Sequence, residues 1–575
     1  MYIQQNISKT KSGKTYKSKL LCHKYREDGK IKTKVLANLS MLSDQAILSL
    51  SNSLGNKKGT TISLNELTAK KAIDFGYIAV LLLLMGRLRI GELFDKIIPT
   101  QSPVIKLLIL GKIITRGSKL AIFNWINRNP QIANILGVDL KKVKLVDIYQ
   151  NLGMLPQYQE QINKKWALYN KTSQNQIFLY DITSSYFEGN QNVLSSFGYN
   201  RDGKKGKKQI TIGLITNSEG FPLKIQVFEG NLNDHKTVME QLQAIKTDFN
   251  AENIVFVGDR GMKIKYNLEK MQECDRVGID YITGLTKDEI KSLLKKNIIQ
   301  MDMFSQELAE IIDQDQRYIL SVNPELTAQS KNFRNKMRDK FEESIFEIRD
   351  SYNKKKNQFQ NNIRKLKDGA KNKKLVTQFT IKQIDSYKQR AHEKLKKYFM
   401  NSFYSIIIDN EKFEIAFDIE GYNNERKLDG AYIITTSVAK EKMDKETVRG
   451  HYKDLQHVEH AFRDMKTCRL DLRPIFHVNE ATTRGHVLVT MFSYAIIHQL
   501  EYKLYPFLKY WNKENKQMLA FHDLEAELKD IKMIELNIGK NCPKIMITEP
   551  TQIQEKIFNI LEIKQSDLMK KICSN

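Results

Sequence analysis

The sequence predicts an α/β protein whose core is a mixed five-stranded sheet with helices on its faces, interrupted by a helical insertion. Over 173–289, short apolar runs read as three strands, a helix, a strand, a helix and a last strand, which favours one mixed sheet. Over 331–400, apolar residues at near-heptad spacing predict a coiled-coil hairpin of two long helices. The strands are expected at 177–181, 210–216, 222–228, 254–257 and 281–283, and the helices at 234–249 and 263–273.

Two segments precede this core. Residues 1–60 form a Lys-rich β segment, because the turn signals Lys11-Ser-Gly-Lys14 and Glu27-Asp-Gly-Lys30 stand beside short strands. Residues 61–172 show helical spacing and form a helical domain, and such a module ahead of a catalytic core is a plausible DNA reader. Its helices are expected at 73–88, 104–115, 119–127, 147–152 and 159–169.

Within the insertion domain, 290–444, one segment carries about half of the chain's net positive charge. Residues 331–400 contain 21 Lys and Arg against 8 Asp and Glu, a net charge of +13. This excess favours a contact with DNA, although the solvated flanks of a coiled coil explain part of it. Strands are expected at 403–408, 413–417 and 432–436. After them, 445–505 completes the core with a buttressing helix at 485–500, and 506–575 is a C-terminal helical region.

Composition limits the class of protein and of partner. At 575 residues the chain is too long for one compact core, so three or more domains are expected. Its net charge of +26 indicates a polyanionic partner, although an AT-rich genome also gives a Lys-rich chain. The five Cys include no CxxC pair, which argues against a zinc motif and a disulfide framework. Without a signal peptide or a membrane-length apolar run, we expect a cytoplasmic protein with no membrane contact.

One stretch without Gly or Pro, 451–466, carries charged side chains at regular spacing. Its apolar residues recur every three or four positions, which predicts an amphipathic helix. Tyr452, Glu459 and Lys466 stand seven residues apart and project from one side, with Arg463 four residues after Glu459. Such a face could bind a metal ion with a phosphate beside it. It also fits a solvated surface in which Glu459 and Arg463 form a pair worth ~0.3–0.5 kcal/mol.

Two further acids end predicted apolar strands. Asp181 and Asp259 would each be held at the rim of the sheet, where neighbouring carboxylates can share a cation, although strand ends also carry ordinary turn acids. If the helix with Glu459 packs on this sheet, the three acids form a hard-oxygen site suited to Mg²⁺ or Mn²⁺. Two such ions would relieve the repulsion between the acids and support in-line phosphoryl transfer.

Four motifs around these residues follow one another in order. They are Leu179-Tyr-Asp-Ile-Thr-Ser-Ser-Tyr-Phe-Glu188, Gly198-Tyr-Asn-Arg-Asp-Gly-Lys-Lys-Gly-Lys-Lys-Gln209, Glu229-Gly-Asn-Leu-Asn-Asp-His-Lys236 and Val257-Gly-Asp-Arg-Gly-Met262. With Tyr452, Glu459 and Lys466 they resemble the DDE transposases of bacterial insertion sequences, and within these the broad "insertion sequence four" superfamily. Its signature places Tyr, Arg, Glu and Lys along one helix, and this chain departs from it at Leu455, where the Arg is expected.

The resemblance implies a ribonuclease-H-like core in which Asp181, Asp259 and Glu459 are the catalytic acids and bind two Mg²⁺ or Mn²⁺ ions. It implies metal-dependent cleavage at insertion-sequence ends and transfer of the freed 3′-hydroxyl into target DNA, which is cut-and-paste transposition. Tyr452 and Lys466 are then expected on backbone phosphate. The expected partners are double-stranded DNA, as terminal inverted repeats and target, and a second copy of the chain in a synaptic homodimer on the bacterial nucleoid.

Other basic residues near the acids are candidates for DNA contact. Arg463 could stand in for the missing Arg, and Arg260 could either orient Asp259 or touch phosphate. A Gly-spaced basic loop between the first two core strands could bind DNA or be a solvated hairpin; it contains Lys204, Lys205, Lys207 and Lys208. Three histidines near the site are expected to be structural, namely His235 beside a capping Asp234, His457 and His460.

Two other functions fit the same residues. One is a ribonuclease-H-like nuclease that cuts DNA without strand transfer, and the helical and Lys-rich domains favour a transposase over it. The other is a degenerate copy that only binds DNA, and the presence of all three acids argues against it. Metal-dependent cleavage would separate these alternatives.

Overall fold

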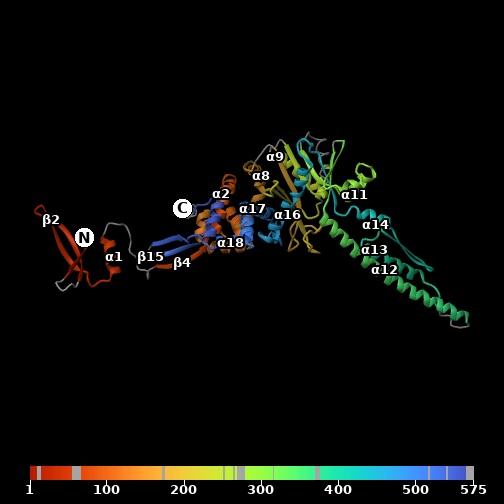
Figure 1. Cartoon of the computed structure of the whole chain (residues 1–575), viewed down its shortest axis with the longest axis horizontal. Helices are drawn as coiled ribbons and strands as arrows, with labels where there is room; N and C mark the ends of the chain where they lie inside the picture. The colour runs from red at the N-terminus through yellow and green to blue at the C-terminus, as the bar shows by residue number, and fades with distance from the viewer. Residues whose placement is uncertain are drawn as a thin grey trace. The chain divides into compact units, whose positions relative to one another are not determined.

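Figure 1 shows a computed structural model of the whole chain, coloured from the N-terminus to the C-terminus. Its internal contacts separate two units, of which the first joins Met1–Leu83 to Leu500–Asn575 and the second is Leu84–Gln499. The structure describes residues 1–9, 15–54, 67–170, 175–232, 234–249, 253–262, 266–267, 279–314, 316–368, 376–515, 518–538 and 542–564. None of the helices in these ranges is long and apolar enough to cross a membrane.

The first unit begins with an antiparallel sheet, which confirms the predicted β-rich start. Its elements are β1 (Tyr2–Lys9), β2 (Thr15–Glu27), β3 (Lys30–Asn38) and a following helix, α1 (Asp44–Leu54). Asp28 and Gly29 connect β2 to β3 with φ of 48° and 76°. Two consecutive positive φ angles are typical of the tight hairpin turn that an Asp-Gly pair favours.

The C-terminal region contains strands, which corrects the predicted helical region at 506–575. It holds α18 (Phe521–Lys529), β15 (Lys532–Ile538), β16 (Cys542–Ile547) and α19 (Gln552–Ile560). β15 pairs with β16 and also with β4 (Leu67–Asp74), so strands far apart in sequence complete one antiparallel sheet. Ile73 and Asp74, expected in the helix at 73–88, therefore belong to β4.

Helices fill residues 75–169, as the sequence predicts. The helices expected at 104–115, 119–127 and 159–169 are confirmed, whereas the short α3 and α6 were not predicted. Gly485 in α17 (Glu480–Asn515) lets that helix approach α7, because a Cβ there would lie 2.0 Å from the carbonyl oxygen of Leu152. The helices are α2 (Phe75–Arg87), α3 (Ile90–Ile97), α4 (Ser102–Thr115), α5 (Lys119–Asn127), α6 (Pro130–Leu136), α7 (Leu145–Met154) and α8 (Gln159–Tyr169).

The core of the second unit is a mixed sheet that contains all five predicted strands. These are β5 (Asn175–Tyr186), β6 (Gln209–Thr216), β7 (Pro222–Glu229), β8 (Asn253–Gly258) and β9 (Ile279–Gly284). They are ordered β9-β8-β5-β6-β7; β5 is parallel to β8 and β8 to β9, and the other pairs are antiparallel. The helix α9 (Asp234–Phe249) connects β7 to β8. Most of the helix expected at 263–273 lies outside the described residues.

The described sheet has eight strands rather than five, because the insertion extends it. β10 (Ala309–Asp313), β11 (Gln316–Val322) and β14 (Ala431–Thr436) continue the order beyond β9 as β10-β11-β14-β9. β14 pairs antiparallel with β9, with Thr435 opposite Thr283. In a five-stranded sheet the outer edge of β9 would be unpaired. The strands of the insertion pair with this edge and cover it.

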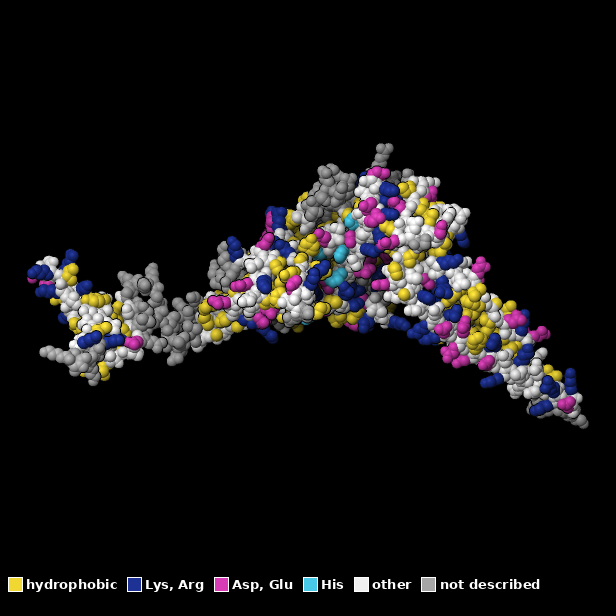
Figure 2. Space-filling model, in the orientation of Figure 1, with side chains coloured by type: hydrophobic (Ala, Val, Ile, Leu, Met, Phe, Trp, Pro, Cys, Tyr) yellow, Lys and Arg dark blue, Asp and Glu magenta, His cyan; other side chains and the backbone are white. Residues whose placement is uncertain are grey.

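The rest of the insertion is an arm, 324–426, with a core of its own. The two long helices and the hairpin strands agree with the predicted positions. Phe341 and Tyr352 of the first helix pack with Tyr387 of the second and with Phe413 of the hairpin. In Figure 2, Lys and Arg side chains are spread along this arm among acidic ones. Its elements are α12 (Pro324–Lys367), α13 (Ile381–Lys397), β12 (Tyr404–Ile408), β13 (Phe413–Phe417) and α14 (Ile419–Arg426).

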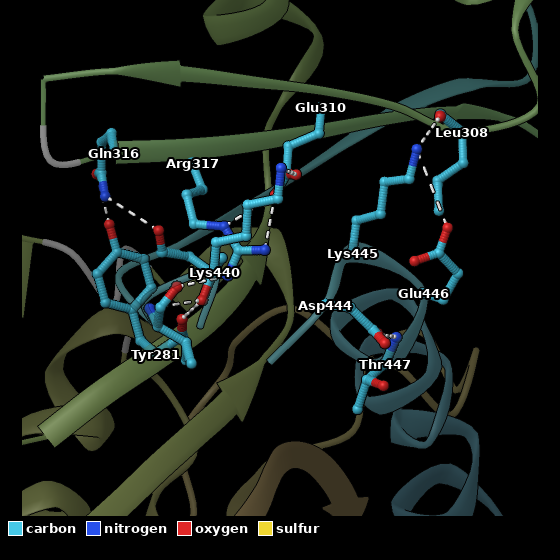
Figure 3. A network of polar contacts seen from close by, with 12 residues as sticks. Tyr281, Leu308, Glu310, Gln316, Arg317, Lys440, Asp444, Lys445, Glu446 and Thr447 are labelled. Atoms are coloured by element: carbon cyan, nitrogen blue, oxygen red, sulfur yellow. Dashed lines mark hydrogen bonds and ion pairs between the residues drawn. The ribbon is translucent and has the colours of Figure 1, made fainter. Parts of the chain in front are cut away.

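A polar network ties these added strands to α15 (Lys445–Lys453), the helix that follows β14 (Figure 3). The guanidinium of Arg317 in β11 lies 2.6 Å from a carboxylate oxygen of Glu310 in β10, and both side chains are buried. Lys445, the first residue of α15, donates to the carbonyl of Leu308 at 3.1 Å. The insertion therefore fixes the start of a helix that leads to the predicted site.

Candidate active site

Two of the predicted acids lie on neighbouring parallel strands. Asp181 stands in β5 where its pairing with β8 ends, and Asp259 directly follows β8. The last residues paired between these strands are Tyr180 and Gly258, so the two acids are at the next position of the register. Parallel strands lie about 4.8 Å apart, and residues at equal register point to the same face. The sheet therefore brings the two carboxylates together.

The third acid, Glu459, lies on α16 (Leu455–Arg463), which packs against β5. The helix predicted at 451–466 is not continuous, because it breaks at Asp454 and ends in the π-helical turn Asp464–Cys468. The two helices pack on different strands: α15 contacts β8, β9 and β14, and α16 contacts β5 and β6.

The acids share one cleft with a volume of about 440 Å³. Four basic side chains line the same space, so negative and positive groups share it. In the part of the chain that the structure describes, no three His, Cys, Asp or Glu side chains lie close enough together to hold a metal ion. The charged residues that line the cleft are Asp181, Arg201, Asp202, Asp259, Glu459, Arg463, Lys466 and Arg473.

Asp181 is partly buried, whereas Asp259 and Glu459 are exposed. Burial, followed by the charges of Asp259 and Glu459, raises the pKa of Asp181 to about 7, although the N–H of Ile182 and the side chain of Arg201 oppose this. The raised pKa keeps part of the Asp181 carboxyl protonated at neutral pH. A cation in the cleft would favour its ionised form.

Tyr452 extends from α15 to the edge of the acids. Its hydroxyl donates a long hydrogen bond of 3.5 Å to Oδ1 of Asp259. Burial and the charge of Asp259 raise the pKa of Tyr452 to about 12, so the hydroxyl keeps its proton. Gly284 makes room for it, because a Cβ there would lie 2.4 Å from the Tyr452 hydroxyl.

Lys466 lies in the cleft but is buried, and its ammonium group is paired with Asp202. It also donates to Oγ1 of Thr183 at 3.0 Å, two residues after Asp181. The carboxylate of Asp202 is fully buried and pairs with Arg473 as well. Burial lowers the pKa of Lys466, and the pair with Asp202 opposes this.

Sequence reasoning missed Asp202 and Arg473. An acid inside a basic loop was the available signal for Asp202, since such a residue needs a cationic partner. Nothing in the sequence near Arg473 marks it, because only the fold brings it to Asp202.

The other predicted DNA contacts lie on the surface. Arg463 is exposed at the cleft, while Arg260 is exposed beside it and its backbone N–H donates to Oδ1 of Asp259 at 2.8 Å. In the basic loop, Lys204 and Lys205 are exposed and Lys207 pairs with Glu188 at 2.6 Å. Lys208 donates to the carbonyl of Asn190 at 3.3 Å.

Leu455 begins α16, so no Arg side chain leaves the helix at this point. Two histidines make the local contacts expected of structural residues: His457 lies 3.9 Å from Asp454 and His460 lies 3.4 Å from Asp464. The side chains of Asp234 and His235 lie outside the described residues.

Comparisons with known proteins identify the family of the chain. The family described as "Transposase DDE domain" matches residues 172–491, and the family described as "IS1634 family transposase, N-terminal domain" matches residues 3–61. No curated protein matches the sequence. A solved structure, the cryo-EM piggyBac transposase synaptic complex with hairpin DNA, has 9% identity to this chain and a TM-score of 0.32, over 84% of this chain and 74% of that chain.

The first match spans more than half of the chain and includes Asp181, Asp259 and Glu459. DDE transposases are enzymes that cut DNA and transfer strands, generally with divalent metal ions. The protein is therefore an insertion-sequence DDE transposase, whose residues 3–61 match the N-terminal domain of the IS1634 family.

Proposed function

We propose that this transposase cleaves DNA at the ends of its insertion sequence and joins the freed 3′-hydroxyl to target DNA, in cut-and-paste transposition. The observation that carries the proposal is the cleft in which Asp181, Asp259 and Glu459 face Arg and Lys side chains. Acids that attract cations, beside bases that attract phosphate, are what phosphoryl transfer requires. The strand order β7-β6-β5-β8-β9 supports a ribonuclease-H-like core with the acids on its central strands.

The donor set fits Mg²⁺ or Mn²⁺, because carboxylate oxygens are the ligands that these ions prefer. Asp181, Asp259 and Glu459 would hold the ions, whose charge would draw the three carboxylates closer together. Burial, and after it the charges of Asp259 and Glu459, raise the pKa of Asp181, and bound cations would oppose this rise. When bound, two ions would activate the attacking water or hydroxyl and stabilise the leaving oxygen.

The chain's own residues prepare the site. Asp181 gives up its proton before it can act as a ligand, which favours a pH near or above 7. Tyr452 orients the carboxylate of Asp259 through its hydroxyl. Lys466 adds positive charge close to Asp181, where Asp202 and Thr183 hold it. Arg463 is exposed on the cleft and is placed to bind an oxygen of the scissile phosphate.

DNA would be held by two kinds of contact, one within the active-site cleft and one on the surface around it. Tyr452 and Lys466 lie within or beside the cleft, so only a strand that enters it reaches them, whereas Arg260 and the lysines of the basic loop meet DNA at the surface. The basic arm would add affinity without sequence readout, because Lys and Arg bind any phosphate backbone. We expect a homodimer that joins two DNA ends in the bacterial cytoplasm.

The test is cleavage of a labelled duplex that carries the element's own end, with Mg²⁺. Wild type should nick the duplex at the end and then join it to target DNA. Glu459→Gln should bind the same duplex without metal but should not nick it. Glu480→Gln is the matched control, because this exposed Glu pairs with Arg484 in α17 outside the cleft, and it should keep full activity.

Each other outcome identifies a different protein. Nicking by wild type without joining would indicate a nuclease. DNA binding without nicking in wild type and both variants would indicate a degenerate, DNA-binding copy. Nicking that survives in Glu459→Gln would move the catalytic site away from the three acids.

A further inference from the structure

A second cavity of the Leu84–Gln499 unit has a volume of about 370 Å³, and half of its lining residues are Lys, Arg or His. Its walls come from α4, α5, α7, α17 and the segment 471–477. Asp471 is the one acid among the residues that line it, all of which the structure describes. We call this cavity the basic pocket; its cationic and imidazole side chains are Lys112, Arg116, Lys119, Arg473, His477 and His486.

Two lysines are buried in the basic pocket without a carboxylate partner. Lys112 is 3% exposed and Lys119 is 5% exposed. Lys112 Nζ donates to the backbone carbonyl of Asp471 at 3.2 Å, and Lys119 Nζ lies 2.6 Å from Nδ1 of His486. Neither lysine forms an ion pair with any Asp or Glu of the described ranges. Buried charges in proteins are ordinarily paired, so these two lysines need an explanation.

The histidine beside Lys119 does not supply the missing charge. Nε2 of His486 lies 3.4 Å from the carbonyl oxygen of Leu472, so Nε2–H donates there and Nδ1 accepts from Lys119. Burial lowers the pKa of His486 well below its usual value, and the charges of Lys119 and Lys112 lower it further. His486 is therefore neutral and orients the ammonium group without cancelling its charge.

Burial makes the lysines costly to keep in their charged form. It lowers the pKa of Lys112 to about 8, although the charge of Asp471 opposes this, and together with the charge of Lys112 it lowers the pKa of Lys119. An anion that enters the pocket would remove this cost, because it would replace the hydration that both ammonium groups have lost. An oxyanion with several acceptor oxygens could accept hydrogen bonds from both Lys112 in α4 and Lys119 at the start of α5.

The basic pocket adjoins the active-site cleft, because Arg473 lines both cavities. A DNA strand whose scissile phosphate lies in the cleft can therefore place another phosphate in the pocket. Phe476 also lines the pocket and is 68% exposed. Its ring offers an apolar surface to the sugar or base of the same nucleotide.

We propose that the basic pocket binds a backbone phosphate of the DNA end, close to the phosphate that is cleaved. The proposal rests on the function proposed above, because it names the part of the same substrate that this pocket takes. Free inorganic phosphate has the same oxygen chemistry, but it would need neither the connection to the cleft through Arg473 nor the exposed ring of Phe476. These two features favour a DNA strand.

The experiment measures binding of the element's end to metal-free protein, which needs no cleavage. Lys119→Met and Lys112→Met should each weaken binding about 10- to 100-fold, the effect of losing a charge-assisted hydrogen bond. Duplexes with one methylphosphonate, a neutral group, would then be tested at each position near the cleavage site. At one position the neutral group should weaken binding by wild type about as much as Lys119→Met does. Binding by Lys119→Met should not weaken further when the same position is neutral, because the contact is already lost.

The control and the stability measurement exclude a merely structural role. Lys106→Met on the same helix α4 removes a lysine that pairs with Asp95 and lies outside the pocket, and it should bind all duplexes as wild type does. Lys119→Met and Lys112→Met should unfold at the same temperature as wild type or higher, because each removes a buried unpaired charge.

Other outcomes would overturn the proposal. Lower unfolding temperatures in both Met variants with unchanged DNA affinity would make the lysines structural. A different result would be that inorganic phosphate stabilises wild type but not Lys119→Met, while no methylphosphonate position weakens DNA binding. The pocket would then be a site for a free anion. If the protein binds DNA as expected here but never cleaves it, the function proposed above fails while the pocket assignment stands.

Discussion

The ammonium group of Lys466 is paired with the carboxylate of Asp202, which is fully buried. A lysine predicted to meet DNA phosphate is therefore already engaged by the protein. The same carboxylate holds Arg473 and accepts a hydrogen bond from the backbone N–H of Tyr186 at 3.2 Å. Asp202 thus joins β5, the π-helical turn and the segment after it.

Replacing Asp202 with Asn should destabilise the protein by about 3–5 kcal/mol, because Lys466 and Arg473 would then remain in a buried site without their counter-ion. Chemical unfolding measures this. Glu188→Gln is the control, since it breaks an exposed pair with Lys207, and it should cost about 1 kcal/mol or less. Equal effects of the two substitutions would contradict the role given to Asp202.

Asp181 gives a pH dependence with a defined sign. Its pKa is about 7 in the folded protein and ~3.9 when unfolded, so the folded protein binds the extra proton between these values. The stability of the metal-free protein should therefore fall as the pH rises from about 4 to about 7.

Divalent ions need the ionised carboxylate of Asp181, so apparent Mg²⁺ affinity should fall up to about tenfold per pH unit below about 7. Unfolding temperatures with and without MgCl₂ test this: the increase should be larger at pH 8 than at pH 6. Asp181→Asn should show little increase at either pH and should be at least as stable as wild type without metal at pH 8. Equal increases at both pH values in wild type would argue against the assignment.

Gly284→Ala should lower cleavage activity with little loss of stability. The added Cβ would meet the hydroxyl end of Tyr452, which can swing away from Asp259 at a cost of about 1 kcal/mol or less. Gly450→Ala on α15 is the control, because no atom lies within 4 Å of its added Cβ and alanine favours a helix. Full activity in Gly284→Ala would mean that the position of Tyr452 is unimportant.

The basic loop should contribute unequally to DNA binding. Lys207 pairs with Glu188, whereas Lys205 is exposed and has no partner among the residues that the structure describes. Lys205→Ala should reduce the slope of log affinity against log salt by up to ~0.9, the value for one phosphate contact. Lys207→Ala should change it less, and the reverse order would place DNA on the other side of the loop.

Much of the fold could be predicted from local pattern alone. Apolar runs in β5 and β8 lead to Asp181 and Asp259, and this pattern identified both acids, although β5 continues past Asp181 to Tyr186 rather than ending there. The long helices α12 and α13 keep their apolar spacing over many turns, so they were also predicted.

Features that depend on distant contacts could not be predicted. β4 and β15 pair across more than 400 positions of the chain, and neither carries a strong strand pattern. The break at Asp454 separates a helix that packs on β8, β9 and β14 from one that packs on β5 and β6, and no Gly or Pro marks it in the sequence. Asp202 resembles any surface acid until the fold places it beside Lys466, so the central ion pair of the cleft was missed.

The arm leaves the sheet and returns to it at adjacent positions. Val322 of β11 pairs with Ala431 of β14, and the N–H of Asn323 donates to the carbonyl of Gly430 at 2.9 Å. Gly430, with φ of 73°, allows this closure, since a Cβ there would lie 2.1 Å from Oγ1 of Thr327. The entropic cost of closing such a loop grows only slowly with its length. The arm is therefore an exchangeable module, and transposases with arms of different reach could be engineered on this core while β5, β8 and α16 keep their places.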